Sequence, residues 1–142
     1  MIIHYCWFGG EKPQKVKDCI ESWKKFCPSF EIKEWNETNY DVNKNSFLKK
    51  CYEARKFAFV SDYARFDILY EHGGLYLDTD VEIIKDISPL LNKSFMGLER
   101  AEQVAPGLIV YAKNKKEDIY KKILDRYNMI DADNFDFKTT VV

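Results

Sequence analysis

The sequence predicts one α/β domain in which helices flank a mainly parallel sheet. Short apolar segments typical of buried strands alternate along the chain with amphipathic segments typical of helices. The chain has 142 residues, enough for one domain and its core, and 46% of them are hydrophobic. No internal repeat or linker divides the sequence, so we treat residues 1–142 as one unit.

The first half of the chain contains two expected strands and a helix. Residues 2–8 form a short apolar run that stops at two glycines, which indicates a buried first strand. In Gln14–Phe26 apolar residues recur at steps of three and four, the pattern of an amphipathic helix. Residues 30–35 alternate apolar and polar side chains and are expected to form a strand with one buried face. Residues 36–45, rich in Asn, Asp and Thr, are expected to form a loop.

The clearest helix of the second half is Phe57–His72. It is apolar nearly all round, as expected of a buried helix, and Gly73 lies where a helix often ends in a left-handed residue. The other expected elements are a short helix over 47–54, strands at 75–77, 81–84, 94–98 and 107–111, and a final amphipathic helix over 116–129.

Composition excludes several functional classes. Lys and Arg total 22 against 23 Asp and Glu, so the chain lacks the basic excess of a nucleic-acid-binding protein. No apolar run reaches the roughly 20 residues of a transmembrane helix, and the start does not resemble a signal peptide. We therefore expect a cytoplasmic protein. Its four cysteines show neither C-x-x-C pairs nor zinc-ligand spacing and are expected to be reduced, buried thiols: Cys6, Cys19, Cys27 and Cys51.

The strongest indication of function is Asp78-Thr79-Asp80, directly after the apolar residues 75–77. Carboxylates at positions i and i+2 of an extended segment point to the same side, where both can face one hard cation. The carboxyl edge of a sheet is also the usual binding crevice of α/β folds. A cation held there by few protein ligands can bind phosphate oxygens and neutralise a departing diphosphate. A solvated acidic turn is the alternative.

A second unusual feature is the charged pair Asp62 and Arg65 within the apolar helix. The two residues are three apart and lie on one face, so their charges must be paired or bound to a ligand. One interpretation is an internal salt bridge. Another is that Asp62 accepts sugar hydroxyls while Arg65 donates to phosphate or sugar oxygens. The two interpretations are compatible, because a salt bridge can hold Arg65 ready for a ligand.

The end of the first expected strand contributes Trp7, just before Gly9 and Gly10. An indole in this position could stack on a nucleobase or belong to the core. His4, inside the same strand, is expected to be a structural residue whose polar atoms are satisfied by neighbours.

Three segments together resemble the D-x-D sugar-transferase family: residues 3–10 (IHYCWFGG), 20–25 (IESWKK) and 57–81. This family includes bacterial capsular-polysaccharide and lipopolysaccharide glycosyltransferases and yeast α-1,6-mannosyltransferases, and it is similar to the glucosylating domains of clostridial toxins. The most specific part is the block S-D-x-x-R…G-G-x-Y-x-D-x-D. The resemblance implies a GT-A-like, Rossmann-type fold, a nucleotide-sugar donor, Mn²⁺ or Mg²⁺, and retention of anomeric configuration.

The resemblance also implies roles for individual residues in donor binding. Trp7 would stack on the base, while the backbone around Cys6 and Phe8 reads the edge of that base. Asp62 and Arg65 would hold the donor sugar and the diphosphate.

The remaining implied roles concern the motif strand. Tyr76 would reach a phosphate, and Asp78 would contact ribose or sugar and approach the metal through water. Asp80 would ligate the metal directly. With Asp62 and Arg65, the two motif aspartates make up the expected catalytic set.

The expected substrates and setting follow from the same resemblance. The surroundings of Trp7 resemble those in uracil-stacking relatives, which favours a UDP-sugar donor. The acceptor would be a glycan or lipid-linked glycan in bacterial surface-polysaccharide synthesis, at the inner face of the membrane. Relatives usually continue beyond this length, and the chain ends in the stretch 138–142 without a polar tail. We therefore expect the donor-binding part of a longer enzyme, truncated at its C-terminus, and leave its own turnover open.

Two other functions are compatible with these residues. One is a non-catalytic module that binds a nucleotide sugar without transferring it. The other is a phosphatase with a D-x-D-x-[TV] nucleophile motif, in which Asp78 attacks phosphorus and Asp80 acts as acid and base. A phosphatase would also need a downstream acidic pair, for which Asp131 and Asp133 are the later candidates.

Overall fold

The computed structural model describes residues 1–137, and the expectation about the stretch 138–142 lies outside the described residues. In chain order the elements are β1 (Ile2–Cys6), α1 (Gln14–Phe26), β2 (Glu31–Trp35), α2 (Ser46–Glu53), α3 (Phe57–His72), β3 (Gly74–Tyr76), a 3₁₀ turn (Ser88–Leu90), β4 (Phe95–Met96), β5 (Leu98–Arg100), β6 (Gln103–Val104), β7 (Val110–Ala112) and α4 (Asp118–Asn128).

The central sheet has the strand order β2-β1-β3-β7-β4. β1 pairs in parallel with β2 along its whole length and with β3 on its other side. β7 and β4 complete the sheet in antiparallel pairing. The α/β class with a mainly parallel sheet is therefore confirmed, and the antiparallel strands lie at one side of it.

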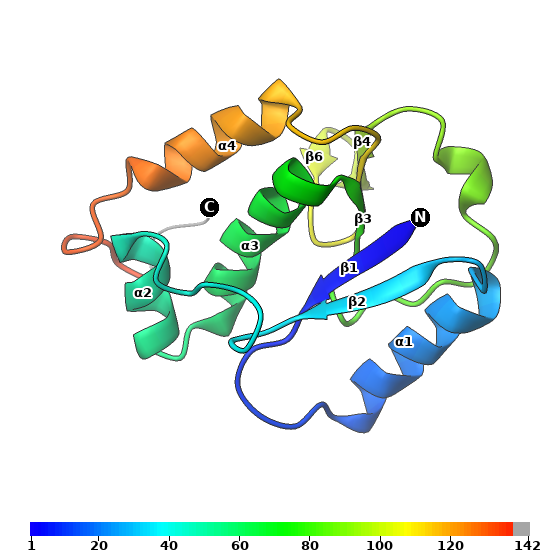
Figure 1. Cartoon of the computed structure of the whole chain (residues 1–142), viewed down its shortest axis with the longest axis horizontal. Coiled ribbons are helices and arrows are strands. Elements are labelled where there is room, and N and C mark those ends of the chain that lie inside the picture. The colour runs from blue at the N-terminus through cyan, green and yellow to red at the C-terminus, as the bar shows by residue number, and fades with distance from the viewer. Residues whose placement is uncertain (138–142) are drawn as a thin grey trace.

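Helices cover both faces of this sheet (Figure 1). Because side chains alternate along a strand, Ile3 and Tyr5 of β1 pack with α1, whereas Cys6 packs with α2, α3 and α4. The same alternation places Leu75 of β3 on the α1 side and Tyr76 on the α3 side. The chain thus forms three layers with a separate hydrophobic core on each side of the sheet.

His4 connects three elements inside the α3-side layer and is 1% exposed. The indole Nε1–H of Trp35 in β2 donates to His4 Nδ1 at 3.1 Å, so the ring proton lies on Nε2. That Nε2 is 3.0 Å from the carbonyl oxygen of Gly73, to which it donates. The structural role expected for His4 is confirmed.

The predicted helices agree well with the observed ones. α1 and α3 have the predicted bounds, and α3 ends at Gly73, whose φ of 65° is a backbone conformation that favours glycine. α2 and α4 begin or end one or two residues from the predicted positions.

Two strand predictions were wrong, and the strand expected at 107–111 begins three residues later, as β7 (Val110–Ala112). Residues 81–84 form no strand, because their backbone bonds instead to side chains of α1: Trp23 Nε1–H donates to the Val81 carbonyl at 2.7 Å, and Ile83 N–H donates to the Ser22 hydroxyl at 3.0 Å. The predicted strand 94–98 is split: β4 ends at Met96, and Leu98 begins a separate hairpin of β5 and β6 that the sequence did not indicate.

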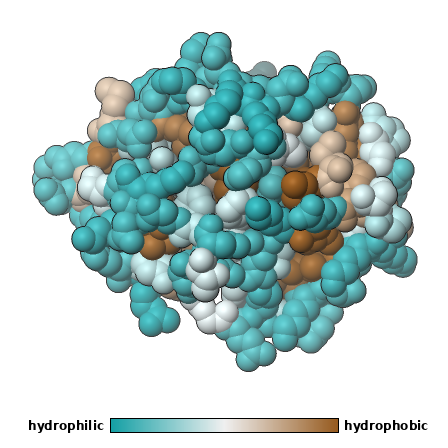
Figure 2. Space-filling model, in the orientation of Figure 1, coloured by the Kyte–Doolittle hydropathy of each residue, from teal (hydrophilic) through white to brown (hydrophobic). Residues whose placement is uncertain are grey.

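Hydrophilic side chains cover most of the face shown in Figure 2, and small hydrophobic patches are exposed between them. No helix within residues 1–137 is long and apolar enough to cross a membrane. The four cysteines are all buried and free.

Candidate functional site

The strand order places a crevice at the carboxyl ends of β1 and β3. From β1 the chain continues to β2 on one side, and it returns to β3 on the other side, so the strand order reverses at β1. In open α/β sheets ligands bind outside the carboxyl ends of strands at such a reversal. A cavity of about 460 Å³ lies there, lined by Cys6, Trp7, Phe8, Gly9, Phe57, Ala58, Ser61, Asp62, Arg65, Asp78, Thr79 and Asp80.

Arg65 of α3 is the central charge of this cavity and is only 6% exposed. Its Nη2 lies 2.8 Å from Asp62 Oδ1 and 3.1 Å from both carboxylate oxygens of Asp78. Its Nε has no hydrogen-bond partner among residues 1–137. Buried donors are nearly always paired in native proteins, so this unpaired buried N–H is an unusual feature of a residue that lines the cavity.

Asp78 is fixed from three directions. The Tyr76 hydroxyl donates to its Oδ1 at 3.1 Å, Arg65 holds both oxygens, and its backbone N–H donates to the Gly107 carbonyl at 2.9 Å. A Cβ on Gly107 would lie 2.1 Å from Asp78 Oδ2, so only glycine leaves room for the carboxylate. Burial raises the pKa of Asp78 and of Asp62, and in both cases the Arg65 charge opposes the shift.

Asp80 is the exposed carboxylate of the site and has no hydrogen-bond or ion-pair partner within residues 1–137. No third His, Cys, Asp or Glu joins the motif into a cluster able to hold a metal by itself in the described part of the chain. Mg²⁺ is commonly bound by one or two carboxylates together with substrate phosphates and water. The donor set therefore fits a cation shared with a diphosphate, with Asp80 as the free ligand.

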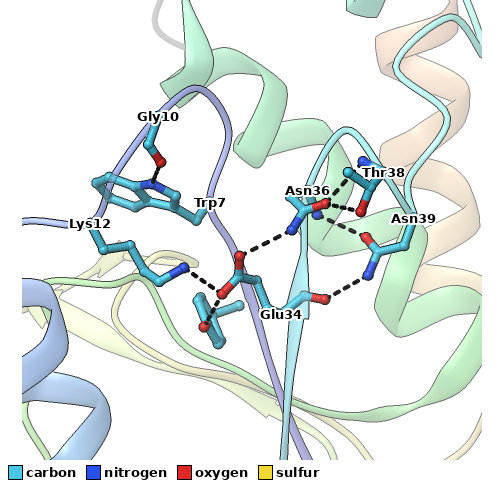
Figure 3. A network of polar contacts seen from close by, with 8 residues as sticks. Trp7, Gly10, Lys12, Glu34, Asn36, Thr38 and Asn39 are labelled. Carbon is cyan, nitrogen blue, oxygen red and sulfur yellow. Dashed lines mark hydrogen bonds and ion pairs between the residues drawn. The ribbon is translucent and has the colours of Figure 1, made fainter.

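Trp7 lies at the rim of the cavity in a loop held by several polar contacts (Figure 3). Its indole N–H donates to the Gly10 carbonyl at 3.0 Å, which closes the loop on itself. Beneath it, Glu34 accepts from Lys12 at 2.6 Å and from Asn36 at 3.0 Å, as Figure 3 shows. The Trp7 ring is partly exposed, and its indole N–H is fixed by the Gly10 carbonyl.

The residues around Trp7 fit closely against α3. Gly9 has a φ of 73°, and a Cβ there would lie 2.2 Å from the Phe57 ring, so this position requires glycine on both counts. Cys6 and Phe8 are buried at the cavity wall. Burial raises the pKa of the Cys6 thiol to about 12, so this group stays protonated and is no nucleophile.

The structure brings seven of the eight predicted site residues to one cavity: Cys6, Trp7, Phe8, Asp62, Arg65, Asp78 and Asp80. The eighth, Tyr76, is 1% exposed and lies beneath the cavity with its hydroxyl bonded to Asp78. Its predicted contact with a phosphate stays a prediction, whereas its contact with Asp78 makes it a support for that carboxylate.

The sequence analysis did not name two sets of residues that form the site. Phe57, Ala58 and Ser61 line the cavity, and their helical spacing to Asp62 and Arg65 could have indicated this shared face. Gly107 gave no signal, because nothing in the sequence connects it to the motif.

Comparison with known proteins identifies the class of this α/β domain. The model of the glycosyltransferase sugar-binding region containing a DXD motif matches residues 13–96, more than half of the chain. The protein therefore belongs to this family of glycosyltransferases.

Individual relatives agree with this assignment. Inositol phosphoceramide mannosyltransferase 1 of Schizosaccharomyces pombe is 27% identical over 72% of this chain, and a glycosyltransferase of Acanthamoeba polyphaga mimivirus is 32% identical over 66%. The matches cover 34% and 40% of those proteins, so the chain spans well under half of their length. The solved PaToxG glycosyltransferase superposes on 87% of this chain and 57% of its own, with a TM-score of 0.66 and 17% identity, and the expected GT-A-like fold is confirmed.

The phosphatase alternative was wrong. The family is one of glycosyltransferases, and the candidate pair Asp131 and Asp133 lines neither cavity at the motif. Asp131 follows α4 and accepts from the backbone N–H of Asp133 and from Asn134 in a local turn.

Proposed function

We propose that the chain is the donor-binding part of a metal-dependent, retaining hexosyltransferase that uses a nucleotide-sugar donor. The observation that carries this proposal is one cavity lined together by Arg65, by the exposed carboxylate of Asp80, which has no partner among residues 1–137, and by Trp7. Those three groups suit a diphosphate, a divalent cation and a nucleobase respectively.

Each residue contributes to binding through its observed contacts. Arg65 is held between Asp62 and Asp78, and its guanidinium charge attracts the diphosphate. Asp62, at the cavity wall, accepts hydroxyl groups of the donor sugar. Trp7 stacks on the base, and the backbone of its neighbours reads the base edge, with uracil favoured.

Mn²⁺ or Mg²⁺ would be held by Asp80 directly and by Asp78 through water, and when bound it would neutralise charge on the departing diphosphate. The chain's own contribution to leaving-group stabilisation is Arg65, whose charge is already in position before the donor arrives. Tyr76 and Gly107 keep the Asp78 carboxylate at the place where Arg65 can pair with it.

Retention would follow from attack of the acceptor hydroxyl on the face of the sugar that the diphosphate leaves. The bond between the anomeric carbon and the phosphate oxygen breaks as the new glycosidic bond forms, and the departing oxygen takes the hydroxyl proton. This mechanism rests on the family resemblance. NMR of the product's anomeric configuration tests it, and an inverted linkage would exclude it.

We place the reaction in bacterial surface-polysaccharide synthesis, on a glycan or lipid-linked glycan acceptor. The resemblance to capsular-polysaccharide glycosyltransferases supports this placement. A lipid-linked acceptor would bring the cytoplasmic enzyme to the inner face of the membrane.

The donor site is tested by calorimetric titration of UDP and GDP into the protein, with Mn²⁺ and with EDTA. We expect metal-dependent binding of UDP that Asp80→Asn loses. Asp125→Asn is the matched control, because Asp125 is exposed on α4, pairs with Lys121 and lines neither cavity at the motif. Binding of neither nucleotide, or equal binding by Asp80→Asn, would contradict the proposal.

A binding module without turnover is the second candidate. The same cavity supports it, because these residues could bind a nucleotide sugar whether or not transfer follows. UDP binding without hydrolysis or transfer of the corresponding UDP-sugars would support it, and release of UDP in the presence of an acceptor would support the enzyme.

A further inference from the structure

A second cavity of about 470 Å³ shares Asp78 and Asp80 with the first. Its other walls come from the segment after the motif and from the β5–β6 hairpin with the loop that follows, including Glu82, Glu99 and Leu108. None of the α3 residues that line the first cavity is among them. The two cavities therefore approach the motif from different directions and meet at its carboxylates.

We propose that this second cavity is the acceptor subsite and that it takes an uncharged, hydroxyl-bearing acceptor. The inference rests on the proposed function, because a transferase must bring an acceptor hydroxyl to the anomeric carbon beside the diphosphate. If the donor's diphosphate binds at Arg65 and Asp80, the space on the far side of Asp80 is where the second substrate can reach it.

The chemistry of the lining defines the class of acceptor. The carboxylates of Glu82 and Glu99 are exposed and have no hydrogen-bond or ion-pair partner among residues 1–137. Both can accept hydrogen bonds from hydroxyl groups. Leu108 is 42% exposed in the same cavity and offers an apolar surface to the C–H face of a sugar.

The charge of the cavity disfavours anionic acceptors. Four carboxylates line it, and no lysine or arginine does so in the part of the chain that the structure describes. Arg65 pairs with Asp78 from the other side, and a bound cation would offset Asp80, but no cation among residues 1–137 pairs with Glu82 or Glu99. A sugar phosphate or uronic acid would meet like charges there, which costs binding energy.

Saturation-transfer NMR on the full chain, with UDP and Mn²⁺ present, tests this subsite. The probes are the methyl glycosides of glucose, galactose and mannose as neutral sugars, and methyl glucuronide and glucose 1-phosphate as anionic ones. We expect the neutral glycosides to bind and the anionic ones to bind at least about tenfold more weakly. Glu99→Gln should weaken neutral glycosides by about tenfold, the loss of one charge-assisted hydrogen bond, without changing UDP affinity.

Two further variants make the result specific. Glu99→Lys should allow methyl glucuronide to bind, because it replaces a negative charge that repels the uronate by a positive one. Glu102→Gln is the matched control, since Glu102 lies in the turn of the same hairpin but does not line the cavity. Normal UDP binding with no glycoside bound, or with glycoside binding unaffected by either Glu99 variant, would overturn the subsite alone. Loss of UDP binding in the unmodified chain would instead overturn the proposed function on which it rests.

Discussion

Replacing Gly107 by alanine gives the sharpest test of how the motif is held. The backbone of Gly107 does not have a positive φ, so alanine would cause no backbone strain there. The added Cβ would nevertheless lie 2.1 Å from Asp78 Oδ2 and 3.2 Å from Arg65 Nη1. Any effect of Gly107→Ala therefore reports on the space that the carboxylate needs.

The size of the effect follows from this contact. Nonbonded carbon atoms pack at about 3.5 Å or more, so the carboxylate or the Gly107 backbone must move by roughly 1 Å. The 3.1 Å contacts between Arg65 and Asp78 cannot survive such a shift unchanged. Overpacking of this kind costs about 1–3 kcal/mol of unfolding free energy, which would lower the melting temperature by roughly 3–10 °C for a domain of this size.

Urea unfolding and UDP titration with Mn²⁺ would be measured on the same preparations. Gly97→Ala is the control: its Cβ would meet the Ile109 side chain at 2.7 Å, so it should lower stability but leave UDP binding unchanged. In a double-mutant cycle Asp78→Ala should remove most of the stability cost of Gly107→Ala, because it removes the atom that clashes. Normal stability and normal UDP affinity of Gly107→Ala would refute the reasoning.

Two further predictions concern buried charge. Arg65→Met should lower the unfolding free energy by about 3 kcal/mol at pH 7, because it leaves the Asp62 and Asp78 carboxylates without their partner. Burial already raises the pKa of both carboxyls, so their protonation should reduce this loss of stability as the pH falls to 5. Urea unfolding at pH 7 and pH 5 measures the loss, and the same loss at both pH values would show that the carboxylates are not responsible. His4 has its pKa lowered to about 4, chiefly by burial, so the unfolded chain binds its proton more readily than the folded one between about pH 4 and 6.5. The contribution of neutral His4 to the unfolding free energy should therefore be fully present above pH 6.5 and fall by up to roughly 3 kcal/mol as the pH is lowered to 4. A His4 ring that titrates above pH 6 by NMR would contradict this.

The parts of the fold that the sequence predicted are those with a strong local pattern. α1 carries a clear amphipathic periodicity, α3 is a long apolar segment ended by Gly73, and the bounds of both were predicted correctly. The strand expected at residues 81–84 failed because an apolar run does not reveal its hydrogen-bond partners. Its backbone bonds to Trp23 and Ser22, which are about sixty residues away along the chain.

The residues of the candidate site likewise fall into those that a local pattern predicted and those that it did not. Residues 57–80 contribute Asp62, Arg65 and the motif aspartates from one continuous segment, so a helix followed by a short strand was enough to bring them together. Gly107 and Glu99 come from an irregular hairpin and loop whose position depends on antiparallel pairing at the sheet edge. That pairing has no local signature here, so neither residue could be connected to the motif in advance.

The charges of the site give a physical reason to expect metal dependence. Asp62, Arg65 and Asp78 together carry one negative charge when ionised, and the exposed Asp80 adds a second. A diphosphate approaching this wall would meet net repulsion that the Arg65 side chain alone does not cancel. A divalent cation at Asp80 would cancel these two negative charges, so a diphosphate could bind to the cation beside the Arg65 guanidinium without net repulsion. We therefore expect the cation to contribute more to UDP affinity than the contact with Trp7 does. Removing the cation with EDTA should accordingly lower UDP affinity more than Trp7→Ala does.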